Sequence, residues 1–258
     1  LSNTENINAR WRGKAFAELD TEEKRRIRSS TIHAIIFEQK HPRNDTGMFQ
    51  IFERINTGGR TLKAQEIRNC VYQGKCNDLL FELNKHDSWR KILGLNVEDS
   101  RMADLELILR YFAMRDLHIR NEGQLKQINL AKYLNKYMGD KTNSTGEDIL
   151  DMKQDFITMI DKVFELLGKN AFKNLKKESE NFASKINPAI FDAISVATSY
   201  AIKTEYKFTE GNYLEKYKRL LKNEEFHRAS SSRTTNIENI KTRIQIAAEF
   251  LYGVTYEW

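Results

Sequence analysis

The chain has 258 residues and a formal net charge of +6, from 42 Lys or Arg against 36 Asp or Glu. No apolar run approaches the roughly 20 residues that a membrane span requires, and the first residues lack the basic and apolar blocks of a signal peptide. These features argue against membrane-spanning and secreted classes, so we expect a cytoplasmic protein with no membrane partner. The modest basic excess permits nucleotide or nucleic-acid binding without demonstrating it.

Helices dominate the predicted secondary structure, which is mainly α. The chain contains only two prolines, and its Leu, Lys, Glu, Ala and Ile content suits long helices far better than a β fold with many turns. A short charged helix is predicted over residues 15–28, capped near Asp20. Residues 30–37 are rich in β-branched side chains and form the one predicted strand. A lone strand leaves its backbone groups unpaired and the first residue is Leu, so we expect partner strands upstream.

The densest basic clusters lie near the start of the chain, at residues 10–14 and 24–28. Trp11 stands among the arginines of the first cluster, and an aromatic ring in such a position can stack on nucleic-acid bases. Short basic runs more often form a solvated face, here beside a Trp11 side chain that packs inward. Both readings remain open at this point.

A helix, a glycine turn and a second helix are predicted between residues 45 and 73. Asp45 can cap the first helix, Asn56–Gly59 ends it, and the second helix begins near Leu62. A helix start and a glycine turn both present free N–H groups to phosphate, and three cations flank them: Arg54, Arg60 and Arg68. Read by itself, this segment is more often a tight interhelical turn, because glycine turns greatly outnumber ligand sites.

The rest of the chain forms a series of predicted helices, at residues 77–85, 88–93, 102–117, 125–137 and 156–167, then after Asn187-Pro188 and after Thr235–Glu238. The helix over 102–117 is apolar on most of its surface, so it should be central, with Glu106 and Arg110 as a partly buried ion pair four residues apart. Asn187-Pro188 is typical of a helix start, and Thr235–Glu238 has the pattern of a capping box. The polar stretch 139–146 is the predicted boundary between two lobes.

No residues stand out as a metal site or as catalytic groups. Cys70 and Cys76 fit no common zinc spacing, and neither His41 nor His227 stands in a cluster of metal ligands. No nucleophile with a base and no constellation of carboxylates is apparent. The sequence therefore predicts no metal site and leaves the catalytic residues unknown.

The segment Phe49–Asn69 resembles the signature of the GmrSD-type restriction endonuclease N-terminal domain family, bacterial proteins with a ParB- and sulfiredoxin-like N-terminal fold. The similarity continues in Arg101–Phe112, in Asn187–Ala193 and in the closing pattern of Phe226, Thr234, Asn236 and Arg243. The resemblance implies that residues 1–75 are the remainder of a truncated ParB-like α/β domain, to which the short strand belongs. Residues 76–258 would be a helical domain, with two lobes divided near 139–146.

The resemblance also implies roles for individual residues. Arg54 would donate a charge-assisted hydrogen bond to phosphate and Asn56 would orient the ligand. The nucleotide or phosphate site would be completed by Gly58, Gly59, Arg60 and Arg68, and supported by Glu66, Glu106 and Arg110. Lys63 stands where the family carries Ser or Thr, which predicts loss of the capping box with Glu66. The competing interpretation is that Arg54 pairs with Glu66 or Glu53 on the surface.

In this family an upstream Asp-Gly-Gln-Gln-Arg motif supports nucleotide hydrolysis or nucleic-acid cleavage in restriction and phage defence. That motif and a downstream HNH nuclease module are absent from these 258 residues, so we expect this chain alone to be inactive. The expected partners are DNA or a nucleotide, with a nucleoside triphosphate and Mg as the implied cofactor, and a partner nuclease chain or domain. The alternative is a non-catalytic helical module that binds DNA or protein through residues 10–28 and 173–177.

Overall fold

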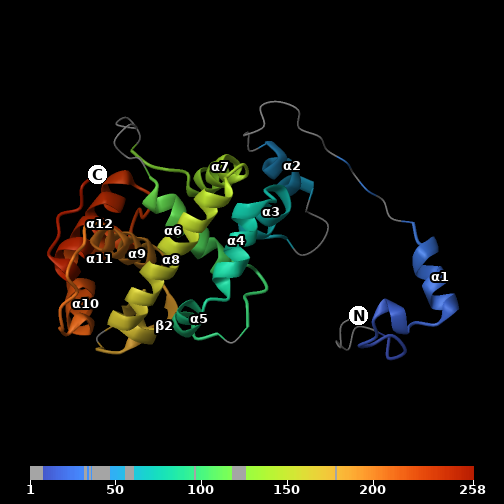
Figure 1. Cartoon of the computed structure of the whole chain (residues 1–258), viewed down its shortest axis with the longest axis horizontal. Helices are drawn as coiled ribbons and strands as arrows, with labels where there is room; N and C mark the ends of the chain where they lie inside the picture. Colours follow the sequence, from blue (N-terminus) through green and yellow to red (C-terminus); the bar gives the residue numbers. More distant parts are fainter. Residues whose placement is uncertain are drawn as a thin grey trace. The chain divides into compact units, whose positions relative to one another are not determined.

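The computed structural model describes residues 8–31, 34, 36, 47–55, 61–95, 97–117, 126–177 and 179–258, without the side chains of Met48, Phe52, Glu53 and Ile55. The chain divides into two compact units, Leu1–Glu38 and Gln39–Trp258. Figure 1 traces both along the sequence. The first unit contains a 3-10 helix, η1 (Phe16–Glu18), and α1 (Thr21–Ser29).

The first unit confirms a short charged helix capped at Asp20, but this helix begins at Thr21 rather than Ala15, because η1 and the cap residue precede it. The Glu23 backbone N–H donates to Asp20 Oδ1 at 2.8 Å, and the Asp20 N–H donates back to Glu23 Oε2 at 3.0 Å. This reciprocal capping box satisfies two N–H groups that a helix start leaves unpaired. The Trp11 indole donates to Glu23 Oε1 at 2.8 Å while its side chain stays 37% exposed, so Trp11 is fixed on the surface of this unit.

The second unit is mainly α-helical, as predicted. Its elements, in chain order, are α2 (Gly47–Ile55), α3 (Ala64–Val71), α4 (Lys75–Asn84), α5 (Asp87–Leu93), α6 (Ala103–Arg115), α7 (Leu130–Lys141), α8 (Gly146–Leu167), η3 (Gly168–Asn170), β1 (Lys173–Leu175), β2 (Phe182–Ile186), α9 (Pro188–Lys203), α10 (Tyr213–Lys222), α11 (Glu224–Ser231) and α12 (Ile237–Tyr252). Helix α9 packs against α6, α8, α11 and α12 (Figure 1). Among the described residues, no helix is both long and apolar enough to cross a membrane.

The core confirms that the helix predicted over 102–117 is central. Seven of the residues of α6 are buried apolar side chains: Leu105, Ile108, Leu109, Tyr111, Phe112, Ala113 and Met114. Edge-to-face aromatic contacts join helices around it, with ring centroids 5.6 Å apart for Tyr111 and Phe156 and 6.2 Å apart for Trp89 and Phe156. Such pairs favour one relative arrangement of the rings that carry them. These rings therefore place α5, α6 and α8 side by side within a core to which α4, α7, α9, α10 and α12 also contribute buried side chains.

The strands lie elsewhere than the sequence predicts. The described residues of segment 30–37, which are Ser30, Thr31, Ala34 and Ile36, are in no strand, and Ile36 is 90% exposed. The antiparallel pair β1–β2 instead lies between the helix predicted to end at Leu167 and the helix predicted to begin after Asn187-Pro188. The Phe182 ring stacks on Tyr217 with centroids 5.8 Å apart, and the Tyr217 hydroxyl donates to the Lys173 carbonyl at 2.7 Å. Packing against α10, rather than β propensity, explains this hairpin.

The polar stretch 139–146 contains the end of α7, a short turn at residues 142–145 and the first residue of α8. Helix α7 continues to Lys141, and Thr145 caps α8 by accepting from the Asp148 N–H at 3.1 Å. Buried residues on both sides of the turn, such as Met138 and Met152, belong to one hydrophobic cluster. Helices α3 and α4, on either side of the predicted division at residue 75, both pack against α6 and α7. The division itself stays a prediction.

The two predicted helix starts in the C-terminal half differ in outcome. Asn187 caps α9 as predicted, since its Oδ1 accepts from the N–H groups of Ala189 at 2.9 Å and Ile190 at 3.3 Å. The predicted capping box at Thr235–Glu238 is wrong, because Asn236 takes the cap position without a side-chain cap bond. The Thr235 hydroxyl instead accepts from Gln127 Nε2 at 2.8 Å, and the backbone here forms a bridge between Gln127 and Asn236.

This difference gives a matched test of helix capping. The substitution Asn187→Ala should lower the free energy of unfolding by about 1 kcal/mol, because it leaves two N–H groups of α9 unpaired. Asn236→Ala should change it by less than about 0.5 kcal/mol, because no cap bond is lost. Urea denaturation followed by circular dichroism measures both. Equal losses in the two variants would contradict the assignment of the caps.

Candidate functional site

Helices α2 and α3 are the two helices of the predicted site. Arg54 lies in the last turn of α2 and is exposed. Asn56, Gly58, Gly59 and Arg60, which the sequence assigns to phosphate, lie outside the described residues, so their roles stay predictions. The structure therefore locates the two ends of the site and not the loop itself.

Arg68, the remaining predicted cation, lies in the core with an exposed fraction of 1%. Its Nε donates to Asn135 Oδ1 at 2.8 Å, and its Nη1 donates to Glu106 Oε2 at 2.9 Å and to Gln65 Oε1 at 3.1 Å. The Phe49 ring of α2 lies 5.9 Å from the guanidinium carbon. Burial lowers the pKa of Arg68, and Glu106 opposes that shift. A phosphate would have to compete with all of these contacts for Arg68.

Glu66 fixes the chain where it enters α3. Its Oε2 accepts from the Lys63 backbone N–H at 2.6 Å and lies 3.1 Å from Arg101 Nε. The predicted loss of the capping box is thus half wrong: Lys63 supplies no acceptor, but the bond from Glu66 back to the cap N–H remains. Arg101 also donates from Nη2 to the Thr61 carbonyl at 2.7 Å. Arg101 therefore joins the residues before α3 to the residues before α6.

Glu106 and Arg110 do not pair with each other, which corrects the prediction from their spacing. Glu106 pairs with Arg68 on α3, and Arg110 pairs with Asp192 on α9. Spacing of four residues brings two side chains to one side of a helix, but it does not decide between partners on different neighbouring helices. Because α6 is packed on several sides, each charge binds a partner across an interface.

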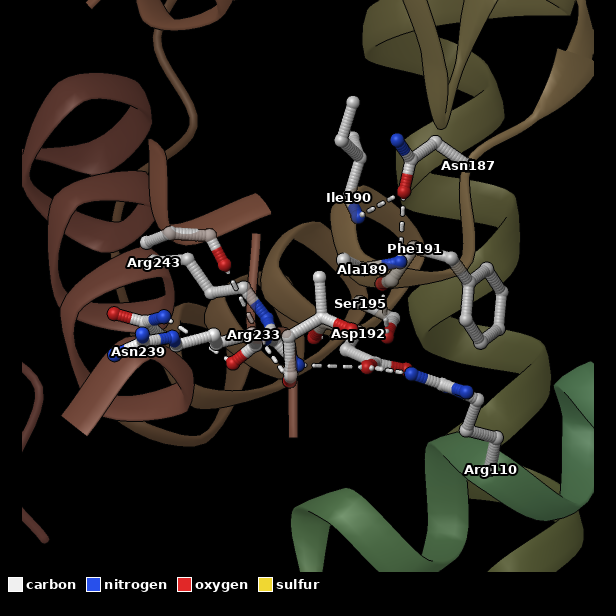
Figure 2. A network of polar contacts seen from close by, with 12 residues as sticks. Arg110, Asn187, Ala189, Ile190, Phe191, Asp192, Ser195, Arg233, Asn239 and Arg243 are labelled. Atoms are coloured by element: carbon white, nitrogen blue, oxygen red, sulfur yellow. Dashed lines mark hydrogen bonds and ion pairs between the residues drawn. The ribbon is translucent and has the colours of Figure 1, made fainter. Parts of the chain in front are cut away.

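Asp192 lies between two arginines at the centre of the second unit. The Arg110 guanidinium binds it in bidentate fashion, with Nε to Oδ1 at 2.6 Å and Nη2 to Oδ2 at 2.7 Å. Arg243 of α12 donates from Nη2 to Oδ2 at 3.0 Å and from Nη1 to the Thr234 carbonyl at 2.7 Å. Figure 2 shows Arg110 and Arg243 reaching Asp192 from different helices. We call these three residues the buried triad.

The buried triad carries one more positive than negative charge in a site closed to solvent. Asp192 and Arg243 have exposed fractions of 0% and Arg110 of 8%. Burial lowers the pKa of Arg243, with Asp192 opposing the shift and Arg110 adding to it. For Arg110, burial also acts to lower the pKa, but Asp192 outweighs it and the pKa is raised. Within the described chain, Arg243 Nε has no hydrogen-bond partner.

Asp192 is not among the site residues predicted from the sequence. A signal was present, because Asp192 is the one acidic residue in α9, where its neighbours Ile190, Phe191, Ala193 and Ile194 are all buried. A carboxylate in so apolar a helix has to be paired, since an isolated buried charge is too costly. The partners could not be predicted from the sequence, because Arg110 and Arg243 are 82 and 51 residues away from Asp192 along the chain.

Comparison of this chain with family models, with curated proteins and with solved structures found no match. The resemblance to the GmrSD-type family therefore stays a prediction. Among the residues that the structure describes, no group of three or more His, Cys, Asp and Glu side chains is arranged to hold a metal ion. The geometry offers a rigid frame of buried ion pairs around α6, with the exposed Arg54 at one edge of the predicted loop.

The buried triad predicts a large effect of a small substitution. Asp192→Asn should lower the free energy of unfolding by about 3–5 kcal/mol, because two buried guanidinium groups lose their counter-charge. Asp151→Asn, at an exposed position of α8, should stay within about 0.5 kcal/mol of the original protein. Urea denaturation compares the two.

If Asp192→Asn does not fold at all, a triple variant keeps the prediction testable. Replacing Arg110 and Arg243 by Met together with Asp192→Leu removes every charge at once and should restore much of the stability. A triple variant as unstable as Asp192→Asn would contradict the charge-based explanation.

Proposed function

We propose that this chain is part of a bacterial restriction or phage-defence protein that binds a nucleotide, DNA or both through the segment from α2 to α3. Hydrolysis would depend on an Asp-Gly-Gln-Gln-Arg motif upstream of this sequence, with Mg and a nucleoside triphosphate as ligand. The observation that carries the proposal is the resemblance of Phe49–Asn69 to the GmrSD-type signature.

The exposure of Arg54 supports the proposal. The competing interpretation was an ion pair of Arg54 with Glu66 or Glu53. Glu66 pairs with Arg101, and the Glu53 side chain lies outside the described residues. Among the described residues, Arg54 has no ion-pair partner, so its guanidinium can meet an anion at the end of α2. A charge-assisted hydrogen bond from Arg to phosphate is one of the stronger polar contacts in proteins.

The contacts that anchor the flanking helices also support the proposal. Both helices meet at Arg68, which donates to Glu106 and Asn135 and lies against the Phe49 ring. A binding loop held at both ends loses less conformational entropy when a ligand orders it. Glu66 and Arg101 add a second attachment just before α3. In this proposal Arg68, Glu66 and Glu106 position the loop, and Arg54 contacts the ligand.

Titration calorimetry with Mg-ATP tests the site. Arg54→Ala and Asn56→Ala should each weaken binding by about tenfold or more, since each removes a polar contact to the ligand. Arg219→Ala, an exposed arginine of α10, is the matched control and should bind like the original protein. Binding that neither Arg54→Ala nor Asn56→Ala alters would contradict the assignment of the site.

A second candidate function is sequence-independent DNA binding by the first unit, without catalysis. Residues 8–31 contain seven basic and four acidic side chains. The carboxylates are used inside the unit: Asp20 and Glu23 form the capping box, Glu22 pairs with Arg26, and Glu18 accepts from the Ala15 N–H. Arg25 and Arg28 are exposed on α1, which leaves cations facing solvent for a phosphate backbone.

Salt dependence tests this candidate. The logarithm of the DNA affinity, plotted against the logarithm of the salt concentration between 50 and 200 mM, should fall with a steep slope. The double variant with Arg25→Ala and Arg28→Ala should make this slope shallower by about 2, because two phosphate contacts are lost. Arg219→Ala should leave the slope unchanged. Negligible binding at low salt would rule out this candidate without affecting the nucleotide site at Arg54.

A further inference from the structure

A cavity of about 910 Å³ opens at the C-terminal end of α6, where Arg115 lies. It is lined by the last turn of α6 at Arg115, by α8 at Asp155, by the last turns of α9 and by the residues that follow α12. Its volume lies in the range of small-molecule sites.

One wall of the cavity is aromatic. The ring centroids of Tyr200 and Tyr256 are 4.6 Å apart, and those of Tyr256 and Trp258 are also 4.6 Å apart. The face of an aromatic ring carries partial negative charge and attracts cations. Trp258 already holds one, because Lys241 Nζ lies 5.5 Å from its ring centre.

Carboxylates outnumber cations in the lining of the cavity. Arg115 pairs with both Asp116 and Asp155. Asp116 is further satisfied by the Tyr137 hydroxyl at 2.8 Å and by Lys141 at 3.9 Å. Glu257 lines the cavity and, among the described residues, has no ion-pair partner. Arg115 binds Asp155 through Oδ2, so the acceptors left to a ligand in the described chain are Oδ1 of Asp155 and the carboxylate of Glu257.

Two helices end at the cavity and add negative potential. Helix α6 ends at Arg115 with Asp116 as its cap, and α9 ends at Lys203 with Thr204 as its cap. The carboxyl end of a helix carries about half a negative charge on its free carbonyl groups. Lys203 is the one lining cation without an ion-pair partner in the described chain, and its place in the last turn of α9 offsets that helix end. The lining thus contains three carboxylates, Asp116, Asp155 and Glu257, against two cations, Arg115 and Lys203.

We propose that this cavity binds a flexible organic cation with more than one primary ammonium group. One ammonium would lie against the faces of Tyr200 and Tyr256, and the others would donate to Asp155 and Glu257. The volume exceeds what a single ammonium fills, and the two carboxylates come from separate parts of the chain, so a ligand with spaced charges fits best. A nucleotide fits poorly, because its phosphates would meet the excess of carboxylates.

Calorimetric titration of the 258-residue protein with spermidine at low salt tests the proposal. Saturable binding is expected, weakened about tenfold by Glu257→Gln, which removes an exposed acceptor without breaking an ion pair. Tyr256→Leu should weaken binding several-fold, whereas Tyr256→Phe, which keeps the aromatic face, should retain it. Asp151→Asn, one turn from Asp155 but outside the cavity lining, is the matched control and should bind normally.

Three results would overturn the proposal: no binding of spermidine, equal weakening by Glu257→Gln and Asp151→Asn, or full retention of binding by Tyr256→Leu. The first would show that the cavity has no affinity for polyamines, and the second that binding reflects only the surface charge. Saturable binding of ATP that Tyr256→Leu abolishes would also overturn it in favour of an anionic ligand. None of these outcomes depends on Arg54 or Asn56, so the proposed nucleotide site is judged separately.

Discussion

The carboxylate of Asp192, held between the guanidinium groups of Arg110 and Arg243, fixes the arrangement of three helices. A buried charge without a partner is too costly to tolerate, so α6, α9 and α12 have to meet with these atoms in register. An apolar contact could slide by a turn at small cost, whereas bidentate pairing at 2.6 and 2.7 Å cannot. The aromatic contacts around Trp89 and Phe156 then fill the space that this arrangement defines.

Helix α6 also forms ion pairs with other parts of the second unit on both sides of Arg110 along its length. Glu106, one turn before Arg110, pairs with Arg68 and so holds α3 and, through Phe49, α2. Arg115, at the other end, pairs with Asp116 and Asp155 beside the cavity. From Glu106 to Arg115 the helix rises by about 14 Å. Three charged residues on one helix thus each join it to a different region of the second unit.

The two proposed binding regions differ in charge: the segment from α2 to α3 is proposed to bind an anionic nucleotide, and the cavity is proposed to bind an organic cation. The segment between α2 and α3 offers an exposed cation, Arg54, beside two carboxylates that are already paired, Glu66 and Glu106. The cavity offers carboxylates and aromatic faces around an arginine that is already neutralised. Ion pairs determine which groups remain for a ligand: in the described chain Arg54 has no ion-pair partner, and Asp155 keeps one carboxylate oxygen that Arg115 does not bind.

The sequence by itself determined the mainly helical class, the central position of α6 and the starts of α1 and α9, since these depend on composition, apolar spacing and local caps such as Asp20 and Asn187. The tertiary structure decided everything that involves distant partners. It placed the hairpin at β1 and β2, separated Glu106 from Arg110, and buried Asp192 between residues 82 and 51 positions away. The spacing of apolar residues in the sequence shows which face of a helix is buried. Which charged side chains form ion pairs depends on their distance in space, and that distance is set only when the helices pack together.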